Sequence, residues 1–315
     1  MTRAIVKVQG KEVRVGTTTN WRGLVATFVS EQDVKESSRQ LYNRTLSQFF
    51  LWVEHSGKVL DSMSRVDILE YKDSLHNEGL SALTIGSYIV AVRKFYEWAE
   101  AHKLYPNIAK GIKTPRREQA FKKQHLKDNK SRELLSYFEA KSLRDFAIVN
   151  LILRTGLRTI EVVRADIGDI TFKGERRVLK VWGKGHTEKD DFVVLSEKAY
   201  LPIAKYLATR KGAKAGEPLF TSNSRNNKGG RLTTRTISQI CKEGLQAIGM
   251  DGREFTAHSL RHTAGCAMLE HGCSLYDVQI ALRHSDPKTT EIYLNSLEEE
   301  TKLKNPPTFA LDAAF

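Results

Sequence analysis

The chain has 315 residues, enough for two domains, and its 40% hydrophobic and 28% charged residues exclude a disordered protein. Fifty Lys and Arg against 37 Asp and Glu give a net charge of +13, which favours a polyanionic partner such as nucleic acid. No apolar run approaches the roughly 20 residues of a membrane span, and no signal peptide is visible, so we expect a cytoplasmic protein without membrane contact.

Residues 1–20 are expected to form an N-terminal extension, in which weak apolar alternation around Gln9 and Gly10 predicts a short hairpin. From Trp21 the apolar residues recur at helical spacing, and Ser64 is a candidate N-cap within this region. Four amphipathic helices with short connections follow over residues 21–110. Because their apolar faces must be buried together, the sequence predicts a small helical bundle.

The composition changes over residues 111–131, which carry seven Lys and Arg against two acids and show almost no apolar period. A solvated linker between two domains has this composition. In a basic protein, a strap that lies along DNA phosphates has it too, and both interpretations stay open.

Residues 132–296 are expected to form a second domain, which opens with an apolar helix ending at Gly156. Strand-like runs follow at 170–172, 178–182 and 192–195, with glycine-containing turns between them. After residue 233 the chain is helical again. The predicted fold is therefore mainly α with a small antiparallel β-sheet, in an N-terminal helical domain and a C-terminal α/β domain.

The three cysteines, Cys241, Cys266 and Cys273, are too few and odd in number for a disulfide framework, and they fit a reducing compartment. Cys266 and Cys273 lie near His271 in the sequence, but no CxxC or HExxH spacing accompanies them. We therefore expect buried helix thiols and no metal site.

Four separated pieces of the second domain carry polar residues that, taken singly, have ordinary structural explanations. An arginine past a helix C-terminus suits the helix dipole, and a His and an Arg three residues apart merely share a helix face. A lysine between glycines is routinely exposed, and a tyrosine after a turn is often half-buried. The residues concerned are Arg158, Lys184, His258, Arg261, His284 and Tyr293.

Taken together, these pieces resemble the tyrosine recombinase (phage integrase) family in their order and approximate spacing. The motifs are TGLRTIE at 155–161, WGKGH at 182–186, HSLRHTAG at 258–265 and LRHSDPKTTEIY at 282–293. The helical bundle over 21–110 is similar to the family's core-binding domain, so the resemblance covers about residues 21 to 296. It implies a recombinase that cuts and rejoins double-stranded DNA through a 3′-phosphotyrosyl link.

The resemblance also implies a role for each site residue. Tyr293 is the expected nucleophile, His258 its general base, and Lys184 the general acid for the departing 5′-oxygen. Arg158 and Arg261 are expected to hold the phosphate oxygens, because guanidinium forks bind them bidentately. His284 would add a hydrogen bond to the phosphate, and Glu161 would orient Arg158. We expect the cationic surroundings to favour the tyrosine phenolate.

No metal or nucleotide cofactor is expected, because the covalent link keeps the bond energy for the reverse attack. Two residues are weaker rivals for these roles: Lys189 for the acid and Tyr276 for the nucleophile. Arg283 stands where the family usually has glycine, and since arginine takes a positive φ only at a cost, the local turn is expected to differ.

The expected assembly is a homo-tetramer on two DNA sites, with accessory DNA-bending or directionality proteins as further partners. Residues 297–315 form a tail that begins acidic, breaks at Pro306-Pro307 and ends apolar. The tail must fold back on its own domain or dock on a neighbouring protomer, and we favour docking in trans.

An integrase that inserts and excises a mobile element is the first functional interpretation. A Xer-like resolvase of chromosome or plasmid dimers has the same active site and is the alternative. A DNA-binding module without catalysis is disfavoured because all six residue types of the site are present. A type IB topoisomerase shares the chemistry but has no need of a synaptic tail.

Overall fold

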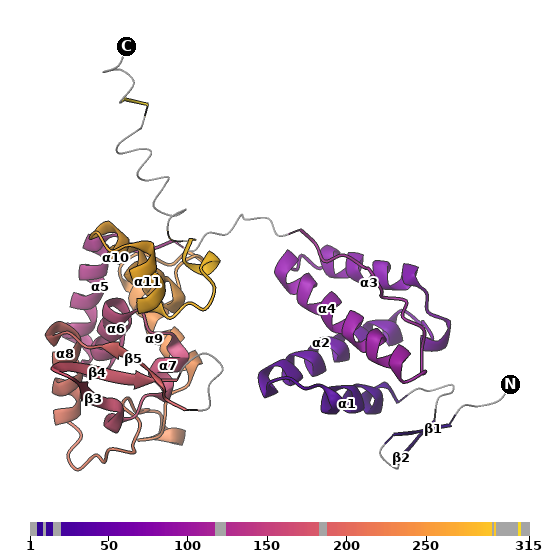
Figure 1. Cartoon of the computed structure of the whole chain (residues 1–315), viewed down its shortest axis with the longest axis horizontal. Coiled ribbons are helices and arrows are strands. Elements are labelled where there is room, and N and C mark those ends of the chain that lie inside the picture. Colours follow the sequence, from indigo (N-terminus) through magenta and orange to yellow (C-terminus); the bar gives the residue numbers. More distant parts are fainter. Residues whose placement is uncertain are drawn as a thin grey trace. The chain divides into compact units, whose positions relative to one another are not determined.

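The computed structural model describes residues 5–8, 11–14, 20–116, 124–182, 188–291, 293 and 308–309. The chain divides into two compact units, Met1–Ala120 and Phe121–Phe315, which are described one at a time (Figure 1). At the start of the first unit, strand β1 (Ile5–Val8) pairs antiparallel with β2 (Lys11–Arg14). Across the part of the chain that the structure describes, no helix is both long enough and apolar enough to cross a bilayer.

The first unit is a bundle of helices whose apolar faces meet in an aromatic core. Phe50 and Phe95 are buried and meet edge to face with their ring centroids 5.2 Å apart, a contact that adds about 0.5–1.5 kcal/mol beyond area burial. Ser64 caps the third helix, where its N–H donates to Asp67 Oδ2 at 2.7 Å. The helices are α1 (Trp21–Glu31), α2 (Glu36–His55), α3 (Arg65–Asn77) and α4 (Ala82–Ala101), with the 3-10 turn η1 (Leu60–Ser62) before α3.

The second unit is organised around helix α6 (Leu143–Thr155), whose apolar residues are buried nearly all round. Helices α5 (Asp128–Lys141), α8 (Glu197–Ala208) and α10 (Ala257–Glu270) pack against it. The other described helices of this unit are α7 (Thr159–Arg164), α9 (Thr234–Ala247) and α11 (Leu275–Leu282), with 3-10 turns η2 (Ile167–Asp169) and η3 (Arg225–Asn227). Figure 1 shows α10 and α11 side by side, and the two helices are in contact.

A three-stranded antiparallel sheet lies beside these helices in the order β3-β4-β5. Its strands are β3 (Ile170–Lys173), β4 (Arg176–Val181) and β5 (Asp191–Val194), with Leu179 of the middle strand fully buried. The sequence expectation of a mainly α fold with a small antiparallel sheet is confirmed. The connection from β4 to β5 includes residues 183–187, which lie outside the described residues.

The end of α6 shows how the fold prepares the site. Gly156 has φ +62°, a left-handed conformation that costs glycine little, and it ends the helix. A Cβ at this position would lie 2.2 Å from Cδ2 of Leu282, so glycine is also needed for the close approach of α11. The chain therefore turns sharply here and places Arg158 at the start of α7, next to α10 and α11.

Candidate active site

Arg158 is held by the first turn of α7. Its backbone N–H donates to Oε2 of Glu161 at 2.7 Å, and its Nη1 donates to Oε1 of the same carboxylate at 2.9 Å. Nη2 donates to the carbonyl oxygen of Arg283 at 3.3 Å. The side chain keeps 30% of its surface exposed. Its guanidinium is thus fixed on one edge while the remaining donors stay accessible.

Arg261 reaches the same place from α10, and with 2% exposure it is among the most buried large side chains. Nη1 donates to the carbonyl oxygen of Gly156 at 2.5 Å, and Nη2 donates to that of Leu282. Burial, and next the charge of Arg158, lower the pKa of Arg261 to about 10, so the group stays charged at neutral pH. Carbonyl oxygens at the ends of α6 and α11 therefore position a second cation.

Glu161 is the anion that compensates these cations, with a side chain 6% exposed. It contacts Arg158 and also Arg283, whose Nη2 lies 2.8 Å from its Oε2, while Nη1 of Arg261 lies 3.9 Å from the same atom. Burial acts to raise the pKa of Glu161, but the charge of Arg283 and the hydrogen bond and charge of Arg158 outweigh it, so the pKa is lowered. A buried carboxylate that serves several guanidiniums is expected to be ionised.

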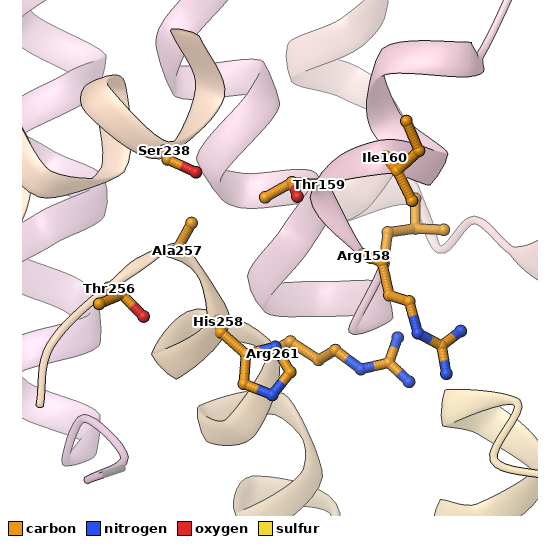
Figure 2. Close-up of a pocket in the computed structure, with 9 residues that line it drawn as sticks. Arg158, Thr159, Ile160, Ser238, Thr256, Ala257, His258 and Arg261 are labelled. Atoms are coloured by element: carbon orange, nitrogen blue, oxygen red, sulfur yellow. The ribbon is translucent and has the colours of Figure 1, made fainter. Parts of the chain in front are cut away.

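Three of the predicted site residues line one pocket of about 390 Å³, namely Arg158, His258 and Arg261. Figure 2 shows the two guanidiniums close together and the His258 ring near the start of the Arg261 side chain. His258 precedes Arg261 by three residues, so both side chains lie on the pocket-facing side of α10. His258, in the first turn, is exposed, whereas Arg261 is buried. The pocket thus presents two cations and an imidazole to a ligand.

Tyr293 and His284 form a ring pair, and both interact with Arg261 of this pocket. Their ring centroids are 5.8 Å apart with planes 12° from parallel, and the ring of His262 lies 4.7 Å from that of Tyr293. Nδ1 of His284 is 2.9 Å from the hydroxyl of Thr290. Burial, and next the charge of Arg261, lower the pKa of His284 to about 4, so its imidazole is neutral at physiological pH.

Burial raises the pKa of Tyr293, whose residue is 4% exposed, although the charge and hydrogen bond of Arg261 act in the opposite direction. The cationic surroundings thus favour the phenolate, as the sequence predicted, but they do not set the direction of the net pKa shift. The cations are present as expected, but desolvation is the larger effect in this structure. The interaction with Arg261 nevertheless connects the tyrosine to the two-arginine pocket.

Comparisons with known proteins identify the family of the chain. Residues 124–300 match the phage integrase family, and residues 24–103 match the N-terminal SAM-like domain of phage integrases. The chain belongs to the phage integrase family. It is therefore a tyrosine recombinase, an enzyme that cleaves and rejoins DNA through a tyrosine intermediate in site-specific recombination.

Among curated relatives, tyrosine recombinase XerC of Pelobacter propionicus is 30% identical over 270 residues, which cover 84% of this chain and 86% of the relative. Among solved structures, XerH recombinase bound to palindromic difH substrate in a post-cleavage complex has a TM-score of 0.70 at 19% identity, covering 91% of this chain and 84% of that one. The Tn1549 transposon integrase in complex with transposon right end DNA has a TM-score of 0.66 at 18% identity, covering 89% and 98%. Both structures share the fold.

Lys184, the expected general acid of this recombinase, lies outside the described residues, as does most of the tail over 297–315. The rival Lys189 is described, and its Nζ forms ion pairs with Asp166 at 2.7 Å and with Asp169. Burial acts to lower the pKa of Lys189, but these two carboxylates raise it overall. A lysine engaged in two ion pairs is poorly suited to deliver a proton. The rival nucleophile Tyr276 is 69% exposed on α11.

Arg283 takes the conformation that a glycine would take, with φ +55°, so the expectation of a different turn is wrong. It ends α11 in the left-handed region, at a cost of roughly 1–2 kcal/mol for a residue with a Cβ. Its ion pair with Glu161 offsets this cost.

His262, which contacts the Tyr293 ring, is a site residue that was not predicted from the sequence. The available signal was its position next to Arg261 in HSLRHTAG.

Proposed function

We propose that Tyr293 is the nucleophile that attacks the scissile phosphate while Arg158 and Arg261 bind its non-bridging oxygens. This proposal depends on one observation: the guanidiniums of Arg158, at the start of α7, and Arg261, from α10, line the same pocket, and Arg261 also interacts with the tyrosine. A phosphodiester gathers negative charge on its equatorial oxygens during in-line displacement. Cations fixed before the reaction stabilise that charge without reorganisation.

The attack forms a bond from the tyrosine oxygen to phosphorus and breaks the bond to the 5′-oxygen. The products are a 3′-phosphotyrosyl link and a free 5′-hydroxyl, and the reverse attack by a 5′-hydroxyl restores the diester. No cofactor is needed for either step. The raised pKa of Tyr293 in the free protein makes a base necessary, and His258, exposed in the pocket, is the proposed one.

Lys184 is the proposed acid for the leaving 5′-oxygen, a role for which the ion-paired Lys189 is less suited. His284, neutral at physiological pH, is proposed to donate a hydrogen bond to the phosphate. Glu161 is a positioning residue, since it holds Arg158 by two hydrogen bonds and does not face the pocket as a ligand.

The proposed substrate is double-stranded DNA, in keeping with the net charge of +13 and with the DNA complexes of the two structural neighbours. The first unit and the basic residues 111–131 would bind the phosphate backbone. The homo-tetramer on two sites, the tail docked in trans, accessory proteins and a cytoplasmic location stay predictions.

For the biological role we propose integration and excision of a mobile element, as the Tn1549 integrase's shared fold suggests. Resolution of chromosome or plasmid dimers is a second candidate, which the 30% identity to XerC favours. Mapping of cleavage on DNA that flanks the gene distinguishes them. Cleavage at the ends of an element supports the first, whereas cleavage at a dimer-resolution site supports the second.

The nucleophile is tested with labelled DNA in a denaturing gel. Wild type is expected to give a covalent protein–DNA band, and Tyr293→Phe is expected to bind the same DNA without forming that band. The matched control is Tyr276→Phe, which should keep it. A band that persists in Tyr293→Phe and disappears in Tyr276→Phe would move the nucleophile to α11.

A further inference from the structure

A cluster of metal-ligating side chains lies on the side of α10 that carries His262. His125, His262 and Cys266 each place one ligand atom so that all three atoms lie within 4.8 Å of one another. Sγ of Cys266 is 3.9 Å from Nε2 of His262. None of the three has a part in the chemistry proposed above. We call them the His–Cys cluster.

The spacing of two members follows from the helix. Residues four apart lie one above the other on the same face, so His262 and Cys266 project from α10 side by side. The two histidines of an HExxH motif hold zinc through the same spacing. Here a cysteine stands at the second position, which a search for HExxH or CxxC does not find.

The third member is brought in from outside the helix and is anchored there. The backbone N–H of Leu126 donates to Oγ1 of Thr263 at 2.8 Å, and the Leu126 side chain is buried. Because residue 126 is tied to α10, the neighbouring His125 is held next to it, with its ring centroid 6.1 Å from that of His262. His125 is half-exposed, which gives an ion a path to the buried pair.

We propose that the His–Cys cluster binds Zn²⁺ and that the bound ion restrains Tyr293. Zinc accepts imidazole nitrogen at about 2.0–2.1 Å and thiolate sulfur at about 2.3 Å, in a tetrahedral arrangement whose ligand atoms are about 3.3–3.6 Å apart. The separation of 3.9 Å between Sγ and Nε2 is close to this range, and the ligand atom of His125, within 4.8 Å of both, must move closer to complete the site. On binding, the Cys266 thiol releases its proton to solvent, and water completes the fourth position.

The restraint follows from the place of His262. Its ring and that of His284 both contact the Tyr293 ring, with centroids 4.7 and 5.8 Å from that of the tyrosine. Zinc would join this imidazole to His125, which lies in the basic segment 111–131 and belongs to the second unit. The ring that supports the tyrosine would then be fixed, and release of Tyr293 toward a phosphate would be slower.

Binding is tested first, with Zn²⁺ in competition with a chromophoric chelator and with Co²⁺ as a spectroscopic probe. We expect one ion per chain and a sulfur-to-cobalt charge-transfer band. Cys266→Ser should lose the band, and both Cys266→Ser and His125→Asn should lose about 100-fold or more in zinc affinity, since even ligands' hydrogen-bond partners account for 10–100-fold. Cys273→Ser, at an exposed cysteine, is the matched control and should match wild type.

A band that survives in Cys266→Ser and disappears in Cys273→Ser, or equal zinc affinity in wild type and His125→Asn, would overturn the site. Cys266 is buried, so its substitution can disturb folding. If Cys266→Ser unfolds, the zinc affinity of His125→Asn, changed at a half-exposed position, decides whether the site exists.

The restraint rests on the proposed role of Tyr293 and is tested separately. Stoichiometric Zn²⁺ should slow covalent-complex formation by wild type several-fold and leave His125→Asn unaffected. Equal inhibition of both proteins, or none of either, would refute the restraint while leaving the binding result intact.

Discussion

Substitution of Glu161 by Gln removes one negative charge from the side chain that serves Arg158, Arg261 and Arg283 while keeping its shape. The carboxylate is 6% exposed, so solvent screening is weak. Removal of one partner from a buried ion pair costs about 3–5 kcal/mol, because the remaining charges are left uncompensated. Gln retains an acceptor for the Arg158 N–H, so we take the lower end, about 3 kcal/mol of unfolding free energy. For a unit of this size that corresponds to a fall in Tm of about 6–12 °C.

The assay is denaturation by urea and heat, compared with Glu133→Gln. Glu133 pairs with Lys130 at 2.7 Å, but the two side chains are 50% and 36% exposed, and such pairs contribute about 0–1 kcal/mol. The folded-state pKa of Glu161 is lowered, so its stabilisation is present above the ordinary value of 4.5 and is lost as the pH falls further. The difference in unfolding free energy between wild type and Glu161→Gln should therefore decrease only below about pH 4.5. Equal stability of the two Gln variants would refute the reasoning.

Three further outcomes are expected from the site. Arg158→Lys should lower the cleavage rate about 10²–10³-fold, because an ammonium point charge cannot replace the bidentate guanidinium. DNA binding measured by gel shift should change little, and near-wild-type cleavage would mean that this arginine is structural. Lys184→Ala should cleave ordinary DNA poorly but should regain its cleavage rate on a substrate with sulfur at the bridging 5′ position, since a thiolate leaves without protonation. If Lys189→Ala is rescued in this way instead, Lys189 is the general acid. Arg283→Gly should lower the unfolding free energy by about 1–2 kcal/mol, because the stabilisation lost with the Glu161 ion pair exceeds the backbone strain that glycine relieves. A variant more stable than wild type would mean that the strain is the larger of the two.

Those parts of the fold that depend on neighbouring residues in the chain could be predicted from the sequence. Helical periods, the glycine that ends α6 and the cap at Ser64 depend on a few neighbouring residues, and the structure has these features. The small sheet was visible as three runs between glycine turns and is confirmed within one or two residues per strand. The motif order was enough to predict the family.

What the sequence could not give depends on contacts between distant segments. Cys273 was expected to be buried but is exposed, because it lies beyond the end of α10. The net rise in the pKa of Tyr293 was not predicted, since its burial and its contacts with His262 and His284 cannot be read from spacing. Arg283 reaches Glu161 across 122 positions, which makes a left-handed arginine tolerable.

The position of His125 beside α10 also depends on a contact between distant segments. Its approach depends on the hydrogen bond from Leu126 to Thr263, 137 positions away. The spacing of His262 and Cys266, in contrast, is local to α10 and is visible in the sequence.

The proposal that Tyr293 is the nucleophile is tested most directly by identifying the residue that carries the covalent link to DNA. A DNA substrate that traps the cleaved complex is digested together with the protein, and the peptide that carries the nucleotide is sequenced by mass spectrometry. We predict a single adduct on Tyr293, joined to a 3′-phosphate. An adduct on Tyr276 or any other residue, or a link to a 5′-phosphate, would contradict it.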